Sequence, residues 1–98
     1  MELRILAGTL ITNQPTGKAM IRFRPHVVEG DARAVGLSSI GPDLDFRREP
    51  LRMVALREIS ADAKGRARVD DTRRSEHRLE IAWEGVDELS YLIIGETG

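Results

Sequence analysis

The sequence predicts an all-β protein, a small antiparallel β-sandwich with about seven strands. Apolar side chains recur at every second position in several segments, most clearly at 19–23 and 79–83. This is the spacing of a strand with one buried face. Clusters of glycine, proline, asparagine and aspartate interrupt these segments at intervals of roughly 10 residues, as in known sandwiches. Two segments that also suit a helix, 51–59 and 78–84, place their apolar residues better as strands.

Length and composition indicate a single domain covering residues 1–98. The chain has 15 basic and 16 acidic side chains, so neither nucleic acid nor a membrane surface is an expected partner. No apolar run approaches the ~20 residues of a membrane span. The first eight residues are too short and too interrupted for a signal peptide. The chain has no cysteine, and a domain of this length is expected to fold without a disulfide or a metal.

The first quarter of the chain predicts a β-hairpin. Residues 2–11 form its first strand, and the face expected to point inward carries Leu3, Ile5, Ala7, Thr9 and Ile11. The opposite face also becomes apolar partway along, as in a central or interface strand. The turn cluster at 13–17 leads into a second strand at 18–24, whose inward residues are Ala19, Ile21 and Phe23. Pro25 ends that strand.

Residues 26–50 predict a long loop. Val27, Val28 and the segment 34–37 suit short strands, but three pairs or triplets of breaker residues separate them: Gly30-Asp31, Gly41-Pro42-Asp43 and Glu49-Pro50. A long loop in a small domain is more often functional than idle. The segment is therefore expected to take part in an interface or a binding site.

The middle of the chain predicts a strand at 51–59, a turn, and a further strand at 66–70. On a helical wheel the apolar residues of 51–59 spread around the whole circumference. As a strand they share one face, with Arg57 as the exception: Leu51, Met53, Ala55 and Ile59. Asp62 and Gly65 suit the first and fourth places of a type I turn. A hairpin is expected here, with Ala67 and Val69 inward.

The last quarter predicts two strands. In 78–84 a helical reading leaves Ile81 in water, whereas a strand places Leu79, Ile81 and Trp83 inward without exception. Core packing is therefore expected for Trp83, in preference to a sugar-stacking platform. The segment 89–94 follows a turn and reads as a buried strand.

A search for chemistry finds no catalytic, cofactor or metal site. His26 and His77 have no second ligand at metal spacing, so both are expected to be structural or surface histidines. The segment 36–41 misses the Gly-x-Ser-x-Gly pattern because its second glycine falls one place late. The segment 43–48 begins like a calcium loop but has arginines where a ligand and the glycine should be. Neither an enzyme nor a small-molecule substrate is expected.

Charge and exposed apolar residues suggest an interface with other subunits. The first 24 residues are mainly basic, and the last 23 mainly acidic. These two ends attract each other in a heterologous contact between subunits, or they are simply solvated strand faces. The residues expected to meet a partner are Leu6, Leu10 and Met20 on outward faces, Arg22 and Arg24 at the basic end, and Glu84 and Glu88 at the acidic end.

Several of these segments together resemble a known class of module. They are Gly8-Thr9-Leu10, the run from Gly17 to Pro25, the run 62–69, and the closing Tyr91-Leu92-Ile93-Ile94. In this pattern the chain is similar to small immunoglobulin-like or transthyretin-like (carboxypeptidase-regulatory) β-sandwiches, as found in tailed-phage tail, fibre-base and head-appendage proteins. The resemblance covers about three quarters of the chain and skips most of 26–50.

The resemblance implies a non-enzymatic structural protein of a bacteriophage virion, in its tail, neck or capsid surface. The implied partners are copies of itself or other virion structural proteins. A second hypothesis is a small carbohydrate- or peptide-binding module that uses the 26–50 loop together with Tyr91. An enzyme is the third hypothesis, and it requires a cleft that brings a histidine within reach of a serine or carboxylate.

Overall fold

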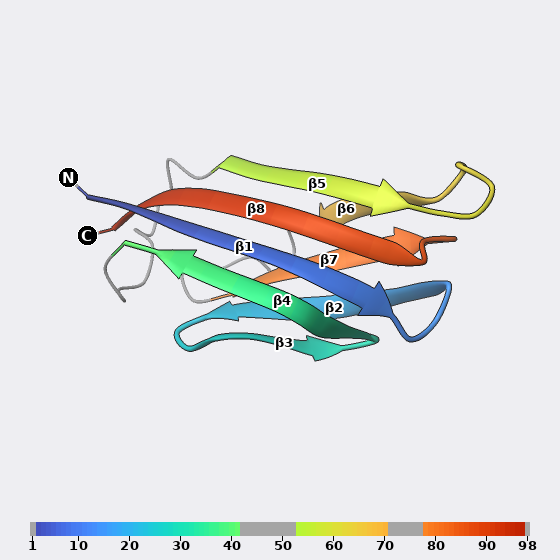
Figure 1. The fold of residues 1–98 in the computed structure, drawn as a ribbon, viewed down its shortest axis with the longest axis horizontal. Helices are drawn as coiled ribbons and strands as arrows, with labels where there is room; N and C mark the ends of the chain where they lie inside the picture. Colours follow the sequence, from blue (N-terminus) through green and yellow to red (C-terminus); the bar gives the residue numbers. More distant parts are fainter. Residues whose placement is uncertain (1, 42–52, 71–77, 98) are drawn as a thin grey trace.

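A computed structural model describes residues 2–41, 53–70 and 78–97 as eight β-strands in two packed antiparallel sheets (Figure 1). The strands are β1 (Glu2–Thr12), β2 (Thr16–Phe23), β3 (His26–Gly30), β4 (Ala32–Ile40), β5 (Met53–Ile59), β6 (Arg66–Asp70), β7 (Arg78–Glu84) and β8 (Glu88–Thr97). Sheet A has the strand order β4-β1-β8-β5, and sheet B has the order β3-β2-β7-β6. The predicted all-β sandwich is confirmed. In the described part of the chain no helix is long and apolar enough to cross a membrane.

One hydrophobic core lies between the two sheets. Its fully buried side chains come chiefly from the central strands: Leu6 and Leu10 of β1, Ile21 and Phe23 of β2, Leu79, Ile81 and Trp83 of β7, and Leu89 and Ile93 of β8. The inward faces predicted for β2, β6 and β7 are thus confirmed, with Ala67 and Val69 packed against the core from β6. Trp83 is 1% exposed and donates its indole N–H to the carbonyl of Gln14 at 3.0 Å, so its predicted place in the core is confirmed.

The predicted long loop at 26–50 is wrong for its first 15 residues, which form β3 and β4. The breaker pair Gly30-Asp31 is the point where the chain leaves sheet B for sheet A. Gly30 has a φ of +118°, a conformation that only glycine adopts easily. Residues 42–50 lie outside the described residues. The expected total of about seven strands allowed for one strand in this segment, and the two observed there bring the total in the described residues to eight.

Both predicted hairpins, at 1–24 and around 62–65, are wrong because each turn carries the chain from one sheet to the other. β1 pairs with β4 and β8, whereas β2 pairs with β3 and β7. Likewise β5 pairs with β8 and β6 with β7. The turn at 60–65 has its positive φ at Ala63, and the Asp62 carboxylate accepts a hydrogen bond from the Lys64 N–H at 3.0 Å. Gly65 is needed for space, because a Cβ there would lie 2.4 Å from the carbonyl oxygen of Gly85.

The predicted inward faces of β1 and β5 are also wrong. In β1 the inward residues are Arg4, Leu6, Gly8 and Leu10, and in β5 they are Val54 and Leu56. Both strands carry apolar residues on both faces, so period-two spacing alone did not distinguish the faces. Arg57 is therefore no exception, since it shares the outward face of β5 with Met53 and Ile59.

Candidate interaction surface

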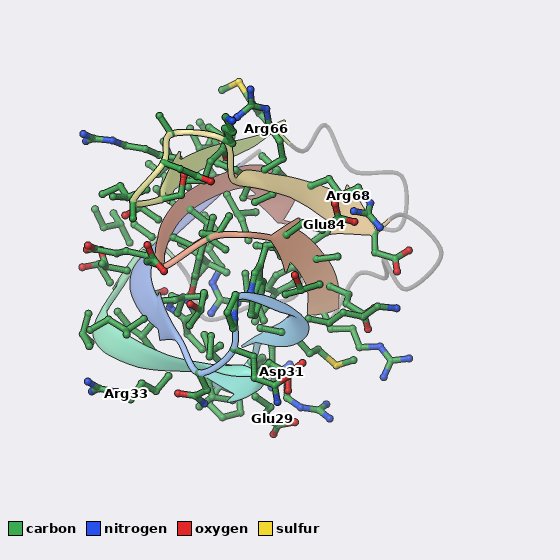
Figure 2. All side chains as sticks on the ribbon, turned by 90° about the vertical axis from the view of Figure 1, so that its right-hand side faces the viewer. Glu29, Asp31, Arg33, Arg66, Arg68 and Glu84 are labelled. Atoms are coloured by element: carbon green, nitrogen blue, oxygen red, sulfur yellow. The ribbon has the colours of Figure 1, made fainter. Side chains whose placement is uncertain are left out.

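The outer face of sheet B is charged, and its charges pair within the chain. The Lys18 ammonium lies 3.8 Å from the Glu80 carboxylate and 3.9 Å from that of Asp70. Arg22 Nε lies 3.2 Å from the Glu29 carboxylate. Figure 2 shows further charged side chains, Arg68 and Glu84, on the side of sheet B. This composition is ordinary for the outer face of an antiparallel sheet, although Glu80 and Ala82 at its centre are only 9% and 3% exposed.

The outer face of sheet A carries large exposed apolar side chains, together with the polar residues Thr9, Ser38, Ser90, Arg57 and Glu88. All eight large hydrophobic side chains that are exposed among the described residues belong to sheet A. They are Leu3 and Ile11 on β1, Val35, Leu37 and Ile40 on β4, Met53 and Ile59 on β5, and Leu92 on β8. Alternation along each strand places six of them on the outer face. Leu37 pairs with the inward Gly8, and Val35 lies at the register shift opposite Thr9 and Leu10. The row Gly36–Thr9–Ser90–Arg57 separates Ile11 and Ile59 from the others. Exposed apolar side chains gathered on one sheet face are typical of an interaction site.

Two rows of mainly apolar residues cross all four strands. In the first row the backbone register aligns Ile40, Ile5, Ile94 and Met53. In the second row it aligns Ser38, Ala7, Leu92 and Ala55. Ile40 and Met53, at the two ends of the first row, are 64% and 61% exposed. We call these two rows, together with Leu3, Ile11 and Ile59, the apolar face.

A hollow of about 350 Å³ opens in the middle of the apolar face. Most of the residues that line it are small: Ala7, Gly8 and Thr9 on β1, Gly36 and Ser38 on β4, and Ser90 on β8; Leu37 and Tyr91 complete the lining. The hydroxyls of Thr9 and Ser90 lie 3.5 Å apart. The half-exposed side chain of Leu92 stands beside the hollow, in the same row as Ala7. The face therefore has both a projection and a depression.

A polar cluster lies on the inner side of the same sheet, at the edge of the core. The His26 ring nitrogen Nε2 lies 2.5 Å from the Tyr91 hydroxyl, and the two rings meet edge to face. Burial lowers the pKa of His26, and the nearby Arg4 charge lowers it further. Burial also raises the pKa of Tyr91. The guanidinium of Arg4, which is 1% exposed, donates to the carbonyl of Phe23. These contacts give His26, Tyr91 and one terminal guanidinium nitrogen of Arg4 partners inside the sandwich.

Tyr91 itself is 3% exposed, so it is not open to a carbohydrate or peptide in the way that the binding-module hypothesis requires. Its ring lies over Gly8 inside the sandwich. Among the described residues no three His, Asp or Glu side chains gather as a metal site would require. His77 lies outside the described residues.

The residues predicted to form an interface are scattered. Leu6 and Leu10 are fully buried in the core, so their predicted contact with a partner is wrong. The reversed face of β1 is the cause. The others do lie at the surface, but on different parts of it: Met20, Arg22 and Glu84 on sheet B, Arg24 in the turn between β2 and β3, and Glu88 at the start of β8. Glu88 alone of these shares the outer face of sheet A.

Sequence reasoning missed Ile5, Ile40, Met53 and Ile94. A usable signal was present, because β1 and β8 both read as apolar on two faces. In a sandwich only one of those faces meets the core, so the second is available to a partner.

Comparison with protein-family models, with curated proteins and with solved structures finds no match to this chain. The similarity to transthyretin-like phage modules therefore stays a prediction from the sequence. Support for a function comes from the geometry of the surface.

Proposed function

We propose that this protein is a non-enzymatic structural subunit that is built into a larger particle through the apolar face of sheet A. The sequence resemblance suggests a tailed-phage virion as that particle. The observation that supports the proposal is the difference between the two outer faces. One carries charges that pair within the chain, and the other carries the row Ile40–Ile5–Ile94–Met53, with Ile40 and Met53 exposed and the two central residues partly exposed.

Leaving this row in water is costly. Apolar surface gains about 25 cal/mol for each Å² removed from water. Each large side chain on the face therefore gains on the order of 1–2 kcal/mol when a partner covers it fully. Protein interfaces have apolar centres and polar rims, and Arg57 and Glu88 lie beside Ile59 at one end of the apolar face.

The test introduces charge into the first row and measures assembly. The double variant Ile40→Lys/Met53→Lys changes two exposed side chains, so the fold should survive with an unchanged circular dichroism spectrum. The control, Val27→Lys, adds a lysine to β3 in sheet B. Each chain is produced alone and together with the products of neighbouring genes, and the mass of every complex is measured by native mass spectrometry.

We expect the wild type and Val27→Lys to enter a complex, and the double variant to stay monomeric. If the wild type is monomeric under every condition, or if the double variant assembles as well as the wild type, the proposal is wrong.

A further inference from the structure

We infer that the partner of the apolar face is a second copy of this chain, stacked face to face about a two-fold axis, with Leu92 of each copy seated in the hollow of the other. This inference rests on the proposed function and names its first partner. It depends on the shape, the charge and the size of the apolar face.

The shape of the face is self-complementary. A two-fold contact uses the same patch on both copies, so a projection needs a matching depression on the same surface. Leu92 and the hollow meet this requirement, since Leu92 pairs in register with Ala7, which lines the hollow. The hollow of about 350 Å³ has ample room for a leucine side chain.

The sheet geometry specifies one arrangement. Packed sheets lie about 10 Å apart, with their strands aligned to within about 30°. An axis parallel to the strands, along the line between β1 and β8, places β8 of one copy over β1 of the other and β5 over β4. Each row then stacks on the same row of the second copy. The Ile40–Ile5–Ile94–Met53 row meets itself, and Leu92 of the second copy lies over Ala7.

The charges at the rim agree with this arrangement. Glu88 pairs in register with Ile11, and Ile11 pairs with Arg33 on β4. When β8 of the second copy lies over β1, its Glu88 faces Ile11 and comes beside Arg33. Figure 2 shows Arg33 at the β4 side of the sandwich, away from sheet B's Arg68 and Glu84. Opposite charges therefore meet at the rim of the stack, where they favour the correct register.

The size of the face is sufficient for a stable contact. Four strands at a spacing of about 4.8 Å are about 19 Å wide, and the nine residues from Leu3 to Ile11 span about 30 Å. The face thus covers on the order of 550 Å² on each copy, or about 1,100 Å² in the pair. A specific interface needs to bury at least about 1,000 Å².

The experiment fills the hollow without disturbing the subunit. A Cβ added at Gly36 meets no described atom within 4 Å, so Gly36→Leu places its side chain in the hollow at no cost to the fold. Leu92→Ser removes the projection, and Val27→Ser on sheet B is the matched control. Sedimentation equilibrium of each purified chain gives the dimer dissociation constant, and thermal unfolding verifies the fold of each variant.

We expect the wild type to form a dimer that Val27→Ser leaves unchanged. Gly36→Leu and Leu92→Ser should each weaken the dimer by about tenfold or more, as for a residue at the centre of an interface. A dimer that tolerates both changes overturns the inference, and so does open-ended growth beyond two copies. A wild type that is monomeric alone but joins a complex with neighbouring gene products also overturns it, while leaving the proposed function intact.

A cross-linking measurement tests the orientation. Because the chain has no cysteine, Ala7→Cys introduces a single thiol close to the proposed axis, and Arg68→Cys introduces one on the far sheet. A short bis-maleimide should link two Ala7→Cys copies and leave Arg68→Cys unlinked. Linking of Arg68→Cys, or none of Ala7→Cys in a proven dimer, would contradict face-to-face stacking.

Discussion

Gly8 lies under the ring of Tyr91 on the neighbouring strand β8. A Cβ at this position would lie 2.4 Å from the ring carbon Cζ of Tyr91 and 2.5 Å from its hydroxyl oxygen. The tyrosine has no free space to move into, because it is 3% exposed and its hydroxyl pairs with His26. Because Gly8 has no side chain, the Tyr91 ring can lie across strand β1 on the inner side of the sheet.

Gly8→Ala should lower the free energy of unfolding by about 1–3 kcal/mol, the usual cost of overpacking a core. The matched control is Gly36→Ala on the paired strand β4, where the added methyl meets nothing within 4 Å. A glycine inside a strand is less stable than alanine by about 0.5–1 kcal/mol, so the control should be neutral or slightly stabilising. Urea unfolding of both variants measures the difference. Equal stabilities would show that Tyr91 does not need Gly8.

His26 makes the stability of the fold depend on pH. Burial and the Arg4 charge lower its pKa in the folded chain below the ordinary value of 6.5. A backbone hydrogen bond at Ser38 opposes the shift, and Tyr91 contacts the ring from β8. Between pH 6.5 and the lowered pKa, His26 therefore binds a proton more readily in the unfolded chain than in the folded chain.

The stability gained from a neutral His26 is present above pH 6.5 and is lost as the pH falls toward the lowered pKa. The free energy of unfolding of the wild type should therefore decrease from pH 7.5 to pH 5 more steeply than that of His26→Gln. His77 is retained in both chains, so its contribution cancels in the comparison. Parallel curves would mean that His26 titrates alike in the folded and unfolded states.

Strand β1 shows how far the sequence could predict an element. Its existence and length follow from alternation, but both of its faces contain apolar residues. Two contacts distant in sequence decide which face is buried: Arg4 reaches the carbonyl of Phe23, and Gly8 makes room for Tyr91. Neither contact leaves a local pattern. By contrast β2 and β7 have one polar and one apolar face, and their orientations were predicted correctly.

The orientation of β1 leads to a prediction for neighbouring residues. Leu10→Ala removes a side chain that is 0% exposed and should cost about 2–5 kcal/mol of stability. Ile11→Ala removes one that is 37% exposed and should cost far less in the monomer. Urea unfolding at dilute protein concentration measures both. If Ile11→Ala were the more damaging change, the sequence-based face of β1 would be correct after all.

The candidate surface was predictable only in part, for a related reason. The outward residues on β4 and β5 join those on β1 and β8 because the strand order is β4-β1-β8-β5. The sequence analysis expected strands that are consecutive in the chain to pair with each other. That expectation gave no reason to place Ile40 and Met53 beside Ile5. The strand order depends on the turns at 13–17 and 60–65, which cross between sheets where a hairpin was predicted.

The whole molecule is made of two halves with the same topology. Strands β1 to β4 and β5 to β8 each give two strands to sheet A and two to sheet B, as β4-β1 beside β8-β5 and β3-β2 beside β7-β6. No repeat is visible in the sequence. The halves join through β1·β8 and β2·β7, which lie at the centre of each sheet. The centre of the fold therefore depends on contacts distant in sequence, and N- and C-terminal strands lie side by side (Figure 1).

This arrangement predicts a pattern of amide hydrogen exchange that also distinguishes two modes of self-association. The central strands β1, β8, β2 and β7 are hydrogen-bonded on both sides, so their amides should exchange slowest. β4 and β5 are the edge strands of sheet A, so their outward amides have no strand partner among the described residues. Face-to-face stacking covers side chains and leaves those edge amides free, whereas edge-to-edge pairing of β4 would bond them to a second chain.

Exchange is followed by NMR at concentrations below and above the dissociation constant. The outward amides of β4 should exchange equally fast in monomer and dimer, because stacked sheets share no backbone hydrogen bonds. Strong protection of those amides in the dimer alone would favour edge pairing, with Val35 and Leu37 at the contact.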